Sequence, residues 1–192
     1  MYVAKFGGMF FYQIDYETSL TQLELTDGEE LFAVIDANRR HLRQWLGWVD
    51  AMRSAADSRS FVQSTLDRNA RDGSFQCAIR VNEFIAGVIG YLWIDRNNRS
   101  TQIGYWLAAD YQGRGIMTRA CQALTRHAFV ELELNRVEIA AAPDNRRSCA
   151  IAERLGFAEE GLHREAEWLY DRYVDNRHYA MTFADWQAHG AR

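Results

Sequence analysis

Apolar and polar residues alternate along some stretches of the chain and recur every three or four residues along others. Alternation is typical of strands, whereas spacings of three and four are typical of one face of a helix. The alternating stretches, which we expect to form strands, are residues 19–25, 75–81, 85–94, 101–107, 136–141, 158–167 and 173–183. The helical stretches lie between residues 26 and 71, after Gly115, and at 145–155.

Several helix boundaries carry signals of their own. Thr26 is followed three residues later by Glu29, the spacing of a capping box, so the first helix is expected to begin at Thr26. A short second helix is expected at 42–49 and a third at 61–71. Gly156 stands where a left-handed residue commonly ends a helix. The helix after Gly115 should bury the apolar face formed by Met117, Ala120, Cys121, Leu124 and Ala128.

The order of these elements is strand, helices, three strands, helix, strand, helix and two strands. Three successive strands with short connections predict an antiparallel meander, and the whole order predicts an α/β fold with a mixed sheet. Pro143 is the only proline, and we find neither a Gly/Ser-rich linker nor an internal repeat. Residues 1–192 are therefore expected to form a single domain.

Composition narrows the class of protein. Hydrophobic residues make up 48% of the chain, enough to bury a sizeable core. The net charge is −4 and the basic residues are scattered, which argues against a nucleic-acid partner. No stretch approaches the 18 or so apolar residues of a membrane span. The three cysteines, Cys77, Cys121 and Cys149, match no metal-binding spacing. We expect free thiols, no metal, no membrane contact and a cytoplasmic location.

A glycine-containing turn follows the strand at 101–107 and opens the next helix. Its sequence, Gln-Gly-Arg-Gly-Ile at 112–116, combines glycines that let a ligand approach the backbone with the unpaired N–H groups of a helix start. Together with the helix dipole, they suit a diphosphate. Arg114 and Thr118 would add a charge and a hydroxyl. By itself the motif is equally consistent with a plain helix entry, whereas the spacing fits neither a P-loop nor a dinucleotide fingerprint.

This turn resembles the coenzyme A loop of the GNAT (Gcn5-related N-acetyltransferase) superfamily. The resemblance extends in order to Ile-Gly-Tyr-Trp-Leu at 103–107, Glu-Leu-Asn-Arg-Val at 133–137, Asp-Asn-Arg-Arg-Ser at 144–148, Arg-Leu-Gly-Phe at 154–157, Ala-Glu-Trp at 166–168 and residues 175–181. It covers about residues 20–185. It is strongest to the branch that acetylates the N-terminal serine or alanine of ribosomal proteins (RimL/RimJ-like).

The resemblance implies a single GNAT domain with a strongly curved mixed sheet, flanked by helices. Two parallel strands, at 103–107 and 136–141, would splay apart and hold the pantetheine arm of acetyl-CoA. Gly104 then makes sense as a point of close approach, although a β-bulge is the simpler alternative. The residues expected to bind acetyl-CoA are Ile103, Gly104, Tyr105, Trp106, Gln112, Gly113, Arg114, Gly115, Ile116, Met117, Thr118 and Asn145.

Acetyl transfer to an amine requires a base for the amine, stabilisation of an oxyanion and an acid for the departing thiolate. The resemblance assigns the base to Glu167, whose pKa the neighbouring Trp168 would raise by lowering local polarity. Glu165 and His163 are alternative bases, and a solvated strand-end carboxylate is the alternative for Glu167. The resemblance assigns the acid to Ser148, which otherwise satisfies a free N–H at the helix start.

Other expectations concern binding. Asn145 is expected to cap its helix, to contact the pantetheine, or both. A backbone N–H near Tyr105 or Trp106 would bind the oxyanion. Cys149 has no paired base by spacing, so it is interpreted as a packing residue rather than a nucleophile. Gln102 stands where many relatives have glutamate, which points to a different acceptor preference.

The acceptor itself stays open at this level. We expect a protein N-terminal amine, such as that of a ribosomal protein, with a small-molecule or antibiotic-like amine as the alternative. A non-catalytic acetyl-CoA sensor is a further alternative. A homodimer is possible by analogy with relatives, but no residue stripe identifies an interface.

Overall fold

The computed structural model describes residues 3–6 and 9–190, and its centre is one sheet with the strand order β1-β2-β3-β4-β5-β6-β7-β9-β8. Neighbouring strands pair antiparallel except β6 and β7, which run parallel. The expected mixed sheet is therefore confirmed. The strands are β1 (Val3–Phe6), β2 (Met9–Gln13), β3 (Thr18–Gln22), β4 (Gln76–Val81), β5 (Phe84–Asp95), β6 (Ser100–Leu107), β7 (Arg136–Ala141), β8 (Ala158–Leu169) and β9 (Arg172–Thr182).

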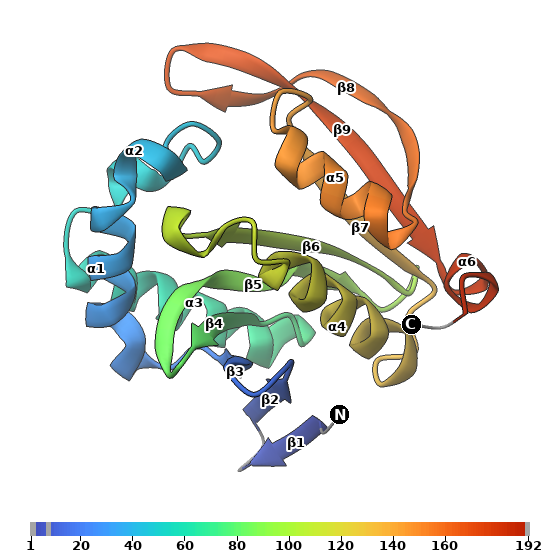
Figure 1. Ribbon diagram of the computed structural model, residues 1–192, viewed down its shortest axis with the longest axis horizontal. Coiled ribbons are helices and arrows are strands. Elements are labelled where there is room, and N and C mark those ends of the chain that lie inside the picture. Colours follow the sequence, from blue (N-terminus) through green and yellow to red (C-terminus); the bar gives the residue numbers. More distant parts are fainter. Residues whose placement is uncertain (1–2, 7–8, 191–192) are drawn as a thin grey trace.

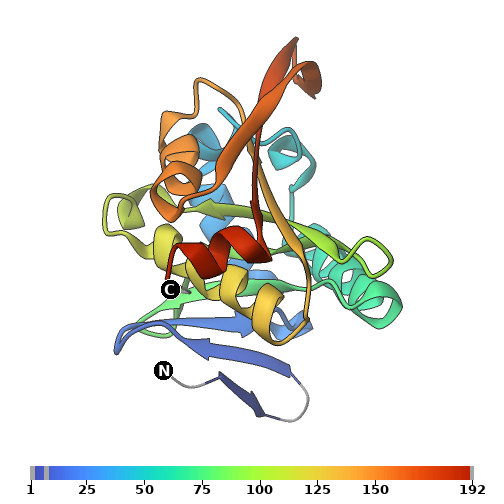
Figure 2. The same ribbon diagram turned by 90° about the vertical axis from the view of Figure 1, so that its right-hand side faces the viewer.

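Helices cover both faces of the sheet. Figures 1 and 2 show α4, α5 and α6 on one face of the sheet, while α1 and α3 pack on the other face and α2 follows α1. The helices are α1 (Gly28–Ala37), α2 (Arg39–Leu42), α3 (Ala55–Asp72), α4 (Ile116–Val130), α5 (Arg146–Leu155) and α6 (Phe183–Ala188). Short 3-10 turns lie at Leu25–Asp27, Val49–Ala51 and Ala109–Tyr111.

Each face of the sheet has its own apolar core. The larger core packs α4 and α5 against the sheet, and the apolar face predicted for α4 is buried within it. The smaller core packs α1 and α3 against Ala78, Ile85 and Val88. All three cysteines are buried and free, as expected. Burial raises the pKa of the Cys77 and Cys121 thiols well above the usual value, so both stay protonated.

The first helix does not begin at Thr26, which corrects the expected capping box. A 3-10 turn at Leu25–Asp27 comes first, and the Glu24 N–H donates to the Asp27 carboxylate at 2.9 Å. Asp27 also accepts from Arg80 Nη2 at 2.5 Å, across to β4. This nearly buried ion pair holds the Asp27 side chain in place, so the capping role falls two residues earlier than the Thr26–Glu29 spacing indicates.

The second expected helix was also misplaced. α2 ends at Leu42, and Trp45 and Trp48 lie in the turns that follow instead of on a helix at 42–49. α3 is longer than the expected 61–71, because it starts at Ala55 behind Ser54, whose hydroxyl accepts from the Asp57 N–H. Its first turns are polar, so apolar spacing does not reveal them.

Strands β1 and β2 and helix α6 were not predicted. β2 pairs with β3 and extends the sheet at its N-terminal edge. At the other end, the last strand stops at Thr182, whose hydroxyl caps α6 by accepting from the Asp185 N–H. Gly156 ends α5 with φ 85°, the left-handed cap that was expected.

Candidate active site

The sheet opens between β6 and β7. Their parallel pairing covers three residue pairs and ends at Gln102 and Glu138. β6 then continues beside β5 to Leu107, while β7 continues beside β9 to Ala141. Figure 1 shows β7, β8 and β9 turning away from β6, so that a wedge separates the two parallel strands. The expected splay is confirmed, and it leaves one edge of β6 without a strand partner inside the sheet.

The turn at 112–115 leads from this strand into α4. Gly113 and Gly115 have φ of 75° and 69°, a region that costs about 1–2 kcal/mol for a residue with a Cβ. A Cβ at Gly113 would meet no atom within 4 Å, so backbone conformation rather than crowding requires glycine there. Among the described residues no side chain caps α4. The N–H groups of its first turn are therefore available to an anion.

A cleft of about 1090 Å³ runs from this turn through the wedge. It is bounded by residues 41–46 after α1, by the end of β6, by the start of α4 and by the start of α5. The expected coenzyme-binding residues that line it are Tyr105, Trp106, Gln112, Gly113, Gly115, Ile116, Met117, Thr118 and Asn145, and Ser148 joins them. The glycine turn and the α5 start, about thirty residues apart in sequence, thus share one cleft.

Three expected coenzyme-binding residues do not line the cleft. Ile103 is 2% exposed and lies in the core. A Cβ on Gly104 would lie 2.6 Å from the Leu92 side chain, so this glycine makes room for a neighbouring strand residue. The register shift in this region is on β5, between Tyr91 and Trp93, and Leu92 is its extra residue. Arg114 is exposed, with its guanidinium 5.4 Å from the centre of the Tyr111 ring.

Four arginines also line the cleft, and none was singled out from the sequence. Arg119, Arg146, Arg147 and Arg154 come from α4 and α5. Arg147 donates to the Gln112 side chain, and Arg154 Nη1 donates to the Thr118 hydroxyl at 3.0 Å. In the sequence, the adjacent Arg146 and Arg147 after the helix cap could have indicated these cleft arginines. Arg119 is ion-paired with Asp15 at 3.0 Å, so the other three guanidinium groups supply the positive charge at the anion-binding end of the cleft.

The start of α5 brings Asn145 and Ser148 to the floor of the cleft. Asn145 Oδ1 accepts from the Ser148 N–H at 3.3 Å, so the expected helix cap is present. The hydroxyls of Ser148 and Tyr105 are 2.8 Å apart, and either can donate. Burial raises the pKa of Tyr105 well above its usual value, so its phenol keeps its proton. Tyr105 can therefore donate to Ser148 and leave the serine proton free for a group in the cleft.

Glu167 lies apart from this cleft, on the β8–β9 hairpin. Its side chain is exposed and accepts from Asn176 Nδ2 at 3.4 Å. Two residues later on the same side of β8, Leu169 is buried and touches the position of Gly47. Glu167 therefore faces the side of the hairpin that meets the segment after α2. Trp168 faces the opposite side, 54% exposed and packed on Tyr173.

The alternative bases lie on the same hairpin. Glu165 has φ 50° and sits in a register shift between His163 and Glu167, with its N–H donating to Asp175. Because of this irregularity, simple strand alternation does not tell whether Glu165 and Glu167 share a face. His163 stacks on His178, with ring centres 3.7 Å apart.

The hairpin tip is tied to the segment after α2. The Tyr170 hydroxyl donates to the Leu46 carbonyl at 2.6 Å, and the Arg43 guanidinium lies 3.8 Å from the centre of the Tyr170 ring. A Cβ on Gly47 would lie 3.4 Å from the Trp168 carbonyl. Leu46 also lines the cleft. The hairpin tip thus meets the segment after α2 beside the cleft, and α2 itself reaches the glycine turn, since His41 Nε2 lies 2.8 Å from Gln112 Nε2.

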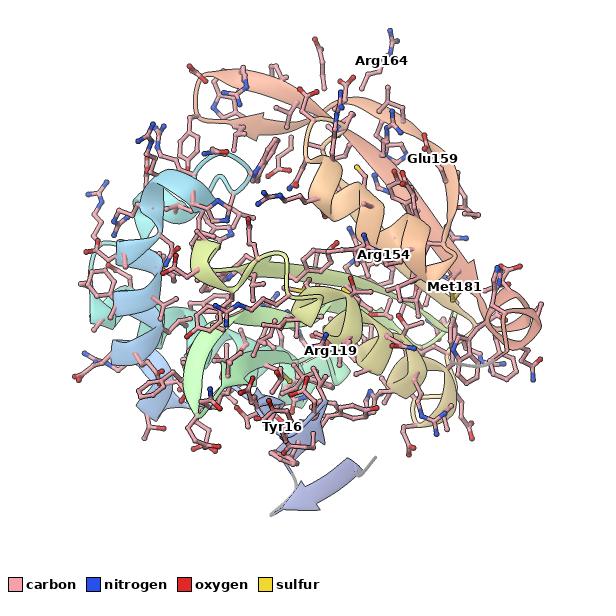
Figure 3. All side chains as sticks on the ribbon, in the orientation of Figure 1. Tyr16, Arg119, Arg154, Glu159, Arg164 and Met181 are labelled. Carbon is pink, nitrogen blue, oxygen red and sulfur yellow. The ribbon has the colours of Figure 1, made fainter. Side chains whose placement is uncertain are left out.

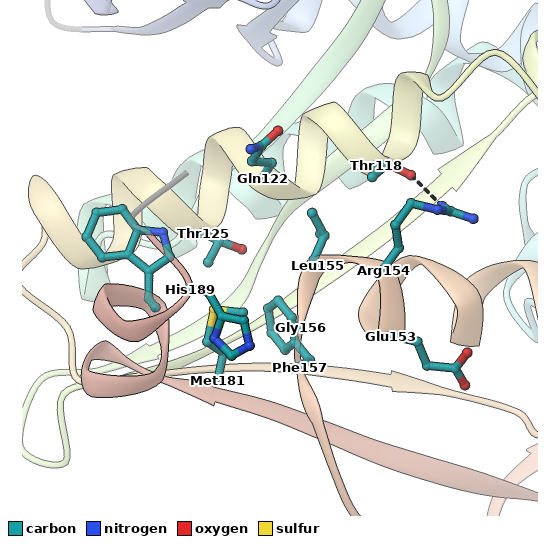
Figure 4. A pocket seen from close by; sticks show the side chains of 11 residues that line it. Thr118, Gln122, Thr125, Glu153, Arg154, Leu155, Gly156, Phe157, Met181 and His189 are labelled. Carbon is teal, nitrogen blue, oxygen red and sulfur yellow. Dashed lines mark hydrogen bonds between the residues drawn. The ribbon is translucent and has the colours of Figure 1, made fainter.

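A second cavity, of about 520 Å³, lies between α4, α5 and α6 (Figure 4). It shares Thr118 and Arg154 with the cleft, and these two residues are hydrogen-bonded to each other. Among residues 3–6 and 9–190, no group of three His, Cys, Asp or Glu residues could hold a metal ion. None of the described helices is long and apolar enough to cross a membrane.

Comparison with known proteins identifies the family. A family model described as "Acetyltransferase (GNAT) domain" matches residues 18–158. The chain belongs to the GNAT acetyltransferase family. It is accordingly an acetyl-CoA-dependent N-acetyltransferase, and the wedge and glycine turn described above are the parts of this GNAT domain that suit the co-substrate.

Individual relatives cover most of the chain. It is 33% identical over 180 residues to the putative ribosomal N-acetyltransferase YdaF of Bacillus subtilis (strain 168), covering 93% of this chain and 98% of that protein. It is 36% identical over 150 residues to the ribosomal-protein-serine acetyltransferase of Escherichia coli (strain K12), covering 78% of this chain and 84% of that one.

Solved structures show the same architecture. RimL, a ribosomal L7/L12 α-N-protein acetyltransferase in complex with coenzyme A, matches with a TM-score of 0.87 at 28% identity, over 91% of this chain and 99% of that chain. The microcin C7 self-immunity acetyltransferase MccE, in complex with acetyl-CoA and AMP, matches with a TM-score of 0.84 at 30% identity, over 88% and 94% of the two chains.

Proposed function

We propose that this GNAT enzyme acetylates the α-amino group of a protein N-terminus, such as that of a ribosomal protein. The observation that carries the proposal is the wedge, which connects two chemically different ends. One end has the α4 start and four arginines and suits the diphosphate of acetyl-CoA. The other is closed by the β8–β9 hairpin, whose exposed carboxylates suit a cationic amine.

The similarity to YdaF and to the E. coli ribosomal-protein-serine acetyltransferase supports this acceptor class, since both names refer to ribosomal substrates. An extended N-terminus can enter a narrow cleft, whereas a lysine on a folded surface is surrounded by other residues that would collide with the cleft walls. The hydrogen bond between Tyr170 and Leu46 keeps the acceptor end narrow and therefore favours an N-terminus.

For the coenzyme end, we propose that the N–H groups of residues 113–118 bind the diphosphate and that Arg114, at the rim, adds charge. Ile103 and Gly104 would contribute through the free backbone edge of β6 rather than through side chains, since their side-chain positions face away from the cleft. Asn145 would orient the pantetheine while it caps α5. A backbone N–H of β6 near Tyr105 or Trp106 would bind the oxyanion.

For the chemistry, we propose that Glu167 takes the proton of the amine and that Ser148 protonates the departing thiolate. The Tyr105 hydroxyl, 2.8 Å from Ser148 Oγ, would replace the proton that the serine gives up. Glu167 lies outside the cleft walls, so the acceptor amine would reach it from the hairpin side. Its amide partner Asn176 holds the carboxylate without neutralising its charge.

An acceptor screen tests the proposal. Peptides beginning with free serine or alanine should release thiol from acetyl-CoA and gain one acetyl group at the terminus, as located by mass spectrometry. The matched control is the same peptide with a blocked N-terminus and an internal lysine, which should not react. Turnover of the blocked peptide, or of none of the peptides, would contradict the proposal.

A small-molecule amine is the second candidate, because the similarity to MccE is of the same order as that to RimL. It predicts turnover of a nucleotide-linked amine with little activity on peptides.

A further inference from the structure

Two histidines stack on the β8–β9 hairpin. The rings of His163 and His178 lie 3.7 Å apart between centres, with 26° between their planes. The two residues are diagonal neighbours, since His178 pairs with Gly161 and His163 pairs with Asn176. Gly161 has no side chain opposite His178, which leaves the ring of His163 free to cover it.

The stacked pair shares a face of the sheet with Glu167. Tyr179, next to His178, points towards α5, where its hydroxyl meets Glu153 at 3.4 Å. Because neighbouring strand residues point to opposite faces, His178 points away from α5. Asn176 is two residues before His178, and its amide donates to Glu167. The pair therefore lies on the side of the wedge opposite α5 and the Ser148 hydroxyl.

The ionised groups around the pair on this face leave it negative. Arg136 on β7 reaches both Glu138 at 2.7 Å and, across β9, Glu160 on β8. Glu167 contacts an amide rather than a cation. Three carboxylates thus face one guanidinium. Gln102, which pairs with Glu138, is neutral, and Asp185 on α6 adds a carboxylate close to Glu160. Nearer the hairpin tip, Arg172 pairs with Leu169 on the same face and forms an ion pair with Asp171. Arg164 points away from the molecule (Figure 3).

We propose that His163 and His178 line the acceptor site and set its charge, so that a proton on either ring weakens the binding of the acceptor's ammonium group. This inference rests on the proposed function and deepens it. With both rings neutral, the negative face attracts the cationic amine to Glu167. It also selects acceptors whose second residue is neutral or basic over acceptors in which that residue is acidic.

The surroundings favour the neutral form of His178. Burial and the stacked His163 lower the pKa of His178, against the opposing effect of Glu138 and Glu160. Two imidazolium rings at this separation would repel each other, so a proton on one ring disfavours a proton on the other. A proton on one ring offsets one of the carboxylates on the face.

The test compares wild type with the double variant His163→Gln/His178→Gln. The KM of the acceptor is measured at pH 7.5 and 5.5, together with the dissociation constant of coenzyme A. The wild-type KM ratio between the two pH values should exceed that of the variant by roughly twofold, the effect of exposed unit charges two to four strand residues apart along β9. The ionisation of the acceptor amine cancels in this comparison. His189→Gln, on the last turn beside Gly156, is the matched control and should behave as wild type.

Two acceptor peptides that differ only in Lys or Asp at the second position give an independent measurement of acceptor preference. Wild type should prefer the Lys peptide at pH 7.5 and lose much of that preference at pH 5.5, while the double variant keeps it. Equal pH dependence in wild type and the double variant would overturn the role of the pair. If a small amine is the acceptor, the same KM ratio is measured with it. If no amine turns over, the proposed function fails, and amine binding followed through the imidazole ring protons by NMR tests the pair directly.

Discussion

The two ends of the wedge are built in different ways. The coenzyme end is made of short sequence segments in which backbone groups do the binding, at Gly113, Gly115 and the first turn of α4. The acceptor end is made of exposed side chains from the β8–β9 hairpin and the segment after α2, joined by the contact of Tyr170 with Leu46. The first end depends on local conformation, and the second depends on how distant segments meet.

This difference explains why the donor is easier to identify than the acceptor. A left-handed glycine before a helix restricts the sequence strongly, because few residues adopt that conformation. The exposed positions of β8 and β9 tolerate many residues without loss of the fold, so they can change with the acceptor. Substitutions at the two ends should therefore separate coenzyme affinity from acceptor turnover.

Among the substitutions, Glu167→Gln should separate coenzyme affinity from acceptor turnover most strongly. Removal of the proposed base should lower kcat by about 100-fold or more, while the dissociation constant of coenzyme A stays within twofold of wild type. Thiol release and isothermal titration calorimetry measure the two quantities. Unchanged turnover would contradict the role of Glu167, and the same loss in Glu165→Gln or His163→Gln instead would move the base to that residue.

Ser148→Ala should reduce kcat by roughly 10- to 100-fold, because the departing thiolate then takes its proton from water rather than from a placed acid. Tyr105→Phe, which keeps the ring and removes only the hydroxyl 2.8 Å from Ser148, is the matched variant. It should lose about threefold to tenfold, the value of one hydrogen bond. A larger loss in Tyr105→Phe than in Ser148→Ala would make the phenol, not the serine, the acid.

Gly115→Ala should weaken coenzyme A binding by about tenfold, since alanine at φ 69° costs roughly 1–2 kcal/mol. Gly161→Ala is the control on the hairpin, because its Cβ would meet no atom within 4 Å and its φ is not in the left-handed region. That variant should bind coenzyme A as wild type does. Equal effects of the two substitutions would show that the glycine turn has no special role.

Tyr170→Phe should have the smallest effect. It removes the hydrogen bond to the Leu46 carbonyl, worth about 0.5–1.5 kcal/mol, and keeps the ring over Arg43. We expect the acceptor KM to rise a few-fold with coenzyme A affinity unchanged. Tyr173→Phe, at an exposed ring packed on Trp168, is the control. A change in coenzyme affinity in Tyr170→Phe would show that the two ends are not independent.

Sequence patterns predicted the parts whose periodicity is dictated by burial. The α4 stripe, the central strands and the Gly156 cap follow directly from apolar spacing and backbone conformation. The same patterns missed the polar start of α3 and misplaced the first helix, where the Asp27–Arg80 ion pair decides the cap. That pair joins residues 53 apart in the chain, so no local window contains it.

The candidate site shows the same difference between local motifs and contacts of distant segments. The glycine turn and the residues at the start of α5 could be named in advance, since each lies in a short motif. The Tyr105–Ser148 contact, the hairpin tie at Tyr170 and the stacked histidines arise only when β6, α5 and the last hairpin come together. The register shift around Glu165 also interrupts the strand alternation, so the sequence pattern does not give the direction of this side chain.

The bare edge of β6 beyond Gln102 has a consequence for the abundance of the protein in the cell. An interior sheet edge exposes backbone donors and acceptors that the chain itself leaves unpaired, and a ligand bound there stabilises the folded state by mass action. Resistance to proteolysis should then rise with the supply of coenzyme. In a cell with little acetyl-CoA, the enzyme would be less abundant, and each molecule would also turn over substrate more slowly.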